Sequence, residues 1–175
     1  FPLGFGAMGI GLTFFGWGLG LAITSVWVAP LLLRRLRLTT VLLIALPLLA
    51  LDLLVAAFVV SSAAALVACI VVGGLVLGVI NTALTEAVME ATDLPRSVAS
   101  SAYSAVRFLG GAVAPPLAAL LWHAFNAGVP YMMAAVSVVI ASLCILFGRR
   151  LLAHIDGAHP DAADEGAAVL VGDAA

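Results

Sequence analysis

Long apolar runs separated by short polar links follow one another along the chain. A helix needs about 20 apolar residues to cross the roughly 30 Å hydrocarbon core of a bilayer. The pattern predicts membrane-spanning helices at residues 9–33, 38–60, 63–88, 98–122 and 129–147. Because the links are short, consecutive helices are expected to run antiparallel. We therefore expect an all-α integral membrane fold with five transmembrane helices.

Composition supports lipid as the surrounding medium. Of the 175 residues, 65% are apolar and 9% are charged, whereas a soluble domain is about half apolar and a quarter charged. We expect residues 1–151 to form a transmembrane helical bundle in a lipid bilayer. Residues 152–175 are polar and acidic, which predicts a disordered tail. Because the first residue is Phe1 rather than Met, we also expect the chain to be a fragment of a longer protein.

Basic residues gather on one side of the predicted bundle. All 7 are Arg, and antiparallel spans place most of them on one side, at Arg34, Arg35, Arg37, Arg96, Arg149 and Arg150. By the positive-inside rule this side is cytoplasmic, so we expect a cytoplasmic C-terminus and tail. The arginines form no patch that could follow a phosphate backbone, which argues against a nucleic-acid partner.

Small and polar residues at helical spacing mark the faces by which helices associate in lipid. Such faces are predicted on the first, third and fourth spans, whereas the second and fifth are expected to face mostly lipid. The GxxxG patterns at 16–20 and 74–78 fit either static packing of neighbouring helices or a surface that slides. The residues expected to pack against a further helical bundle are Gly16, Gly20, Gly74, Gly78, Ser100, Ser104, Gly110, Gly111 and Pro115.

Three ionisable residues at membrane depth are candidates for proton coupling, because a charge there is costly unless it is neutralised or solvated. Asp52 is either a protonation site coupled to transport or a structural hydrogen-bonding group. Glu86 and Arg107 are equally distant from the turn near residue 96, so an ion pair between adjacent helices is expected. The alternatives are an Arg107 side chain that snorkels to the interface, or Glu90 as its partner.

Polar residues on the third span, together with one tryptophan, indicate a place for a small molecule. Asn81, Thr82 and Thr85 either line an aqueous cavity near Glu86 or hydrogen-bond helix to helix, and Trp17 is a further cavity-lining candidate. No span carries a Ser/His pair, two close Asp residues or a cluster of metal ligands. We therefore expect no enzymatic activity, no metal and no cofactor.

Residues 78–90 and 96–115 closely resemble the tenth and eleventh helices of bacterial multidrug efflux members of the major facilitator superfamily. Residues 14–35 resemble the eighth helix of that family and the loop after it. The resemblance implies that the five spans are helices eight to twelve, from a six-helix C-terminal bundle whose seventh helix is missing. The loop at 34–38 departs from the family pattern because it contains no Gly.

The resemblance also implies a function. In that family, proton influx drives efflux of apolar or cationic drugs across the bacterial cell membrane by alternating access. The expected partners are the missing N-terminal bundle of the same protein, a small-molecule substrate and protons. A solute importer of the same fold and a non-transporting membrane scaffold are the alternatives.

Overall fold

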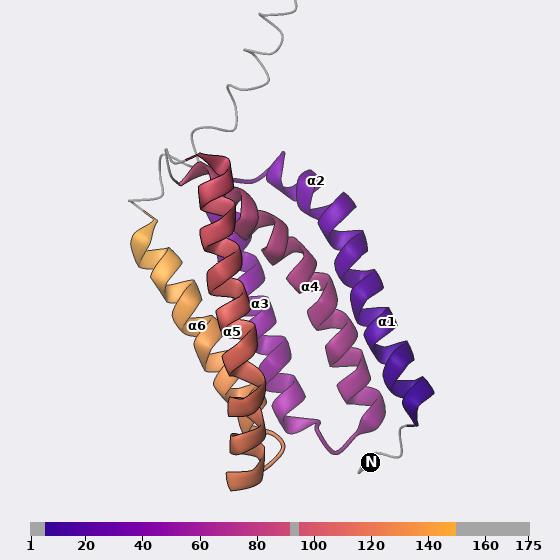
Figure 1. Ribbon diagram of the computed structural model, residues 1–175. Coiled ribbons are helices and arrows are strands. Elements are labelled where there is room, and N and C mark those ends of the chain that lie inside the picture. Colours follow the sequence, from indigo (N-terminus) through magenta and orange to yellow (C-terminus); the bar gives the residue numbers. More distant parts are fainter. Residues whose placement is uncertain (1–5, 92–94, 150–175) are drawn as a thin grey trace, which may run out of the picture.

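The computed structural model describes residues 6–91 and 95–149, which form helices and the short links between them (Figure 1). The first span combines α1 (Ala7–Ile23), the π-helix η1 (Thr24–Val28) and α2 (Ala29–Leu33). The other spans are α3 (Leu38–Phe58), α4 (Ala63–Glu90), α5 (Arg96–Ala124) and α6 (Val129–Gly148). The described residues contain no strand, and 5 helices among them are long and apolar enough to cross a membrane. The predicted all-α fold with five such helices is confirmed.

The helices begin and end where the apolar runs do. Each differs from its predicted range by no more than about two residues at either end. α5 follows directly after Pro95, whose extended backbone, with ψ of 135°, and missing N–H suit the residue before a helix. The predicted tail at 152–175 and the predicted position of Arg150 lie outside the described residues.

The central helices of the bundle are α3 and α4 (Figure 1). α1 packs along α4, α6 packs along α3, and α5 crosses one face of the bundle and contacts α4 and α6. The apolar core connects α3 with α4 and with the end of the first span. Its buried members include Leu33, Leu38, Leu42, Leu46, Leu49, Ile80 and Ala83.

The position of α3 corrects the expectation that the second span faces mostly lipid. Among the described residues α3 is the most buried span, whereas α5 has Ala99 as its buried residue and α6 has Ala135. α3 packs through leucine and alanine side chains. The positions of glycine, serine and threonine therefore do not indicate which face of α3 is buried. The buried residues of α3 are Leu38, Thr39, Val41, Leu42, Ala45, Leu46, Leu49, Ala50, Ala56 and Ala57.

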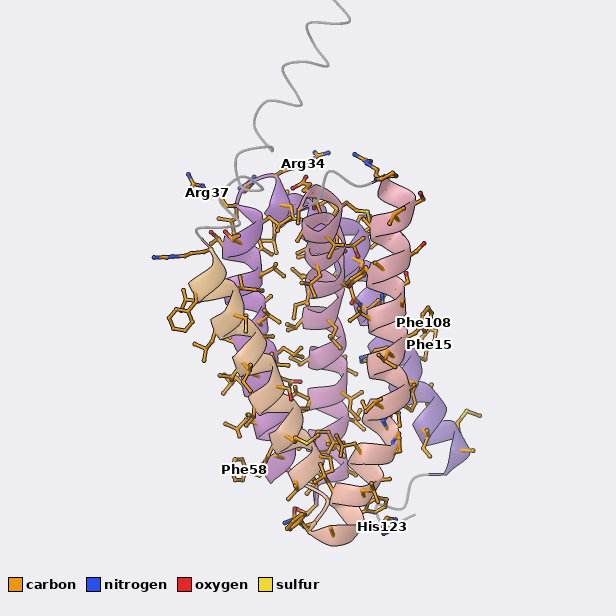
Figure 2. The ribbon with its side chains drawn as sticks, turned by 60° about the vertical axis from the view of Figure 1, so that its left-hand side comes forward. Phe15, Arg34, Arg37, Phe58, Phe108 and His123 are labelled. Atoms are coloured by element: carbon orange, nitrogen blue, oxygen red, sulfur yellow. The ribbon has the colours of Figure 1, made fainter. Side chains whose placement is uncertain are left out.

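The two ends of the bundle differ in charge. Figure 2 shows Arg34 and Arg37 at one end and Phe58 and His123 at the other. We call the first of these the arginine end. It contains the α2–α3 link, the start of α5 and the end of α6 (Figure 1). The spans therefore run antiparallel, as predicted. The assignment of the arginine end to the cytoplasm stays a prediction.

A side-chain cap begins α6. The Asn126 Oδ1 atom accepts hydrogen bonds from the backbone N–H groups of Gly128 (2.9 Å) and Val129 (3.2 Å). These donors have no partner within the helix, because they lie at its start. Gly128 is buried against Ala57 of α3, and a Cβ atom there would lie 2.6 Å from the Ala57 carbonyl oxygen. A polar cap and one close backbone approach thus fix the start of α6.

We expect the substitution Asn126→Ala to destabilise the protein by about 1 kcal/mol, because the Gly128 N–H loses its acceptor and the Val129 N–H keeps only its bond to the backbone carbonyl of residue 126 (3.3 Å). Thermal unfolding of the purified protein in detergent should show a melting temperature lower by a few degrees. Asn126→Asp keeps an acceptor oxygen and should melt close to the wild type. Equal melting temperatures for the alanine and aspartate variants would contradict this role.

Candidate functional site

A wide helical turn interrupts the first span. Residues 24–28 form the π-helix η1, directly before the turn that contains Pro30. A wider turn accommodates Pro30, which has no N–H to donate and crowds the preceding carbonyl. The buried Thr24 hydroxyl donates to the Gly20 carbonyl (2.9 Å), and the Ser25 hydroxyl donates to the Gly78 carbonyl of α4 (3.0 Å). This hydrogen bond ties the first span to α4.

Glycines allow the same two helices to approach closely. A Cβ atom on Gly74 would lie 2.5 Å from the Trp17 carbonyl oxygen, and one on Gly78 would overlap the Thr24 hydroxyl. On the α1 side, a Cβ on Gly16 would lie 3.3 Å from Val71 and one on Gly20 would lie 3.2 Å from Leu75. The glycines of both GxxxG patterns therefore lie at a helix contact within this chain. Both alternatives, static packing and a sliding surface, stay predictions for this contact.

Four polar residues near the end of α4 border a hollow of about 400 Å³: Asn81, Thr82, Thr85 and Glu86. Positions three and four apart share one face of a helix, which places Thr82 beside Thr85 and Glu86, and Asn81 beside Thr85. Three of these residues were expected to line a cavity, and the fourth was expected to lie beside them. Trp17 is not among them, because it packs against Gly74 at the contact between α1 and α4.

Hydrogen bonding gives this hollow an acceptor-rich lining. The Thr82 hydroxyl donates to the Gly78 carbonyl (3.1 Å), and the Thr85 hydroxyl donates to the Asn81 carbonyl (2.7 Å). Because each hydroxyl proton is engaged within α4, the oxygen lone pairs are what the two threonines can offer to a ligand. An ionised Glu86 carboxylate is also an acceptor. The hollow therefore suits a molecule that carries hydrogen-bond donors or a positive charge.

The other ionisable candidates lie apart from the hollow. Asp52 is half-buried on α3 beside Gly73, which lies about 12 Å from Asn81 along α4 at 1.5 Å per residue. Arg107 is exposed on α5. The Glu86–Arg107 ion pair stays a prediction. The described residues contain no group of His, Cys, Asp or Glu side chains that could hold a metal ion.

The small-residue face of α5 is largely open in the described part of the chain. A Cβ atom on Gly110 or Gly111 would meet no heavy atom within 4 Å. Ser100 and Pro115 are exposed, and Ser104 is half-buried. Packing of this face against a further bundle stays a prediction.

Two residues at the helix contacts were not predicted from the sequence. Ser25 follows Thr24 directly, and its hydroxyl reaches α4 because the wide turn changes the direction of the side chains. Gly73 faces Asp52 of α3, whereas its neighbour Gly74 faces Trp17 of α1. Two adjacent glycines were the available signal, because they allow close approach of helices from two sides.

Comparison with known proteins gives one informative match. No family model matches the chain, and no solved structure matches it. Over 151 residues the chain is 43% identical to a Bacillus subtilis (strain 168) protein named multidrug efflux protein YfmO. The match covers 86% of this chain and 38% of that protein, so the chain spans less than half of the relative. The chain is thus a multi-pass membrane protein that is similar, over most of its length, to part of a multidrug efflux protein.

Proposed function

We propose that this chain is part of a secondary transporter that exports small molecules, and that the hollow on α4 belongs to the substrate path. The hollow, with Asn81, Thr82, Thr85 and Glu86 around it, is the observation that carries the proposal. The similarity to a protein named for multidrug efflux supports it. In this proposal the protein is a transporter rather than an enzyme.

The chemistry of the hollow suits an amphipathic cation. Acceptor oxygens and the Glu86 carboxylate would hold a positive charge or N–H donors, and the apolar surface within the hollow would receive the rest of the molecule. Glu86 lies one turn before the end of α4 at Glu90, so the hollow lies toward the arginine end. A substrate would therefore enter or leave the hollow from that end.

Transport requires a second structural unit. We place this chain in the C-terminal bundle of a major facilitator protein in the bacterial cell membrane, with a second bundle opposite the open face of α5 and with proton influx as the driving force. Alternating access would then occur by rocking of one bundle against the other. The glycine contact and the Ser25–Gly78 hydrogen bond would keep α1 and α4 together as one unit.

The test uses the complete transporter in inverted membrane vesicles, with a fluorescent cationic dye as substrate. An imposed proton gradient should drive dye movement, and an ionophore that removes the gradient should abolish it. Dye movement in the opposite direction would indicate an importer instead. If no dye or solute tested moved in response to the gradient, the result would contradict transport and favour the non-transporting scaffold.

We expect Thr85→Val to reduce dye transport several-fold, because it removes one acceptor oxygen from the hollow without changing the size of the side chain. Ser137→Ala is the matched control, since the Ser137 hydroxyl donates to the Met133 carbonyl of its own helix (2.9 Å), on an exposed face of α6. Initial transport rates, corrected for the amount of protein, measure the effect. Equal losses of transport rate in both variants would contradict a role of the hollow in transport.

A further inference from the structure

A second polar cluster lies where α3, α4 and α6 meet, away from the hollow. It comprises the half-buried residues Asp52 on α3, Cys69 on α4 and Tyr131 on α6. Cys69 lies close enough to both Asp52 and Tyr131 for an electrostatic interaction with each. Asp52 and Cys69 each lie about 9 Å inside the ends of their helices at Phe58 and Ala63, by 1.5 Å per residue. These ends lie opposite the arginine end.

Gly73 makes room for the carboxyl group in this cluster. A Cβ atom on Gly73 would lie 2.9 Å from the Asp52 Oδ2 atom, closer than such contacts normally are. The absence of a side chain at Gly73 therefore lets the carboxyl group lie directly against the backbone of α4. The notch therefore places the carboxyl group between the two central helices of the bundle.

Among the described residues, the surroundings of Asp52 supply no cation. Cys69 and Gly73 face it from α4, and Tyr131 lies on the α6 side of the cluster. α2, which also contacts α3, lies at the arginine end. Within the described residues the carboxyl group makes no hydrogen bond or ion pair. An acidic group at membrane depth that lacks a cationic neighbour commonly marks a proton or ion path.

We propose that Asp52 is a proton-binding site that exchanges its proton with the compartment opposite the arginine end, and that Cys69 and Tyr131 line the approach. The carboxylate takes a proton from hydronium and releases a water molecule, and the reverse step returns the proton. The role of this site in coupling rests on the proposed function, whereas its occupancy by a proton does not. The site is distinct from the hollow, which lies nearer the arginine end.

Infrared spectroscopy of the complete transporter in lipid tests the occupancy without any drug. The wild-type spectrum minus that of Asp52→Asn should show the carbonyl band of a protonated carboxyl group, which disappears as the pH is raised. Asp52→Glu should restore a titrating band, and Gly73→Ala should shift its midpoint by crowding the carboxyl group. No titrating band in the difference spectrum, or a midpoint that Gly73→Ala leaves unchanged, would overturn the proposal.

Thiol labelling tests the side of access. With Cys144 replaced by alanine, a membrane-impermeant maleimide should modify Cys69 only when added opposite the arginine end. The reciprocal variant, Cys69→Ser, keeps Cys144, which is exposed near the arginine end of α6, as the control for sidedness. Cys69 labelling only from the arginine end would overturn the direction of exchange.

Coupling is measured separately from occupancy. In vesicles, Asp52→Asn should bind the cationic dye as the wild type does. The increase in its transport rate that the proton gradient produces should be smaller by at least about tenfold. A titrating Asp52 band together with no dye transport by the wild type would refute the proposed function alone. Normal gradient dependence in Asp52→Asn would refute the coupling role of Asp52.

Discussion

Replacing Gly78 by alanine should force α1 away from α4 and give the largest loss of stability. The new Cβ atom would overlap the Thr24 hydroxyl and would lie 2.5 Å from the Leu21 carbonyl oxygen. The backbone carbonyl cannot move aside as a flexible side chain would, and the Ser25–Gly78 hydrogen bond at the same place would be lost. Overpacking of this kind typically costs about 1–3 kcal/mol, and we expect the upper end of that range.

The measurement is thermal unfolding of the complete transporter in detergent, together with the yield of monodisperse protein. Gly148→Ala on α6 is the matched control, because a Cβ atom there would meet no heavy atom within 4 Å in the described part of the chain. Combining Gly78→Ala with Thr24→Ala should restore only part of the stability, since the Leu21 carbonyl remains in place. Equal melting temperatures for the position 78 and position 148 variants would contradict the close packing.

Neutralising Glu86 should give the largest functional effect. In the proposed transporter, Glu86→Gln keeps the shape of the hollow but removes its negative charge, so transport of a cationic dye should fall by at least about tenfold, or roughly 1.4 kcal/mol. Transport of an uncharged substrate should change little, because the threonine and asparagine oxygens remain. Initial rates for both substrates in the same vesicles measure the difference.

Two further variants sharpen the interpretation of the Glu86 result. Glu86→Asp retains the charge on a shorter side chain and should fall between the wild type and the glutamine variant. Glu90→Gln removes an acid from the same helix one turn away, outside the hollow, and should transport the cationic dye nearly normally. Equal losses for cationic and uncharged substrates in Glu86→Gln would argue for a structural role of Glu86 instead.

The sequence contains enough information to locate the helices and the face of the hollow. Apolar runs with short links define the spans, because the thickness of the bilayer sets the length that each run must reach. Asn81, Thr82, Thr85 and Glu86 share a face by helical geometry alone, so their gathering at one hollow follows from their spacing. Both inferences require only one helix at a time.

The contacts between helices could not be predicted in the same way. Spacing shows that Gly74 and Gly78 share a face, but their partners depend on the depth of α1 relative to α4 and on the wide turn at Thr24–Val28. Likewise, Asp52 meets Gly73 only because of the relative height of α3 and α4. The burial of α3 depends on its neighbours in space, which its leucine-rich sequence does not specify.

The Gly78 carbonyl oxygen accepts two hydroxyl groups from different directions, Ser25 of the first span and Thr82 of α4. Because this carbonyl lies within α4, the backbone N–H four residues later is also its donor, so neither hydroxyl is needed to satisfy it. Either hydroxyl position can therefore change without leaving an unsatisfied backbone group in lipid. Gly78 itself has no such freedom, because any Cβ atom there would meet the Leu21 carbonyl of the first span.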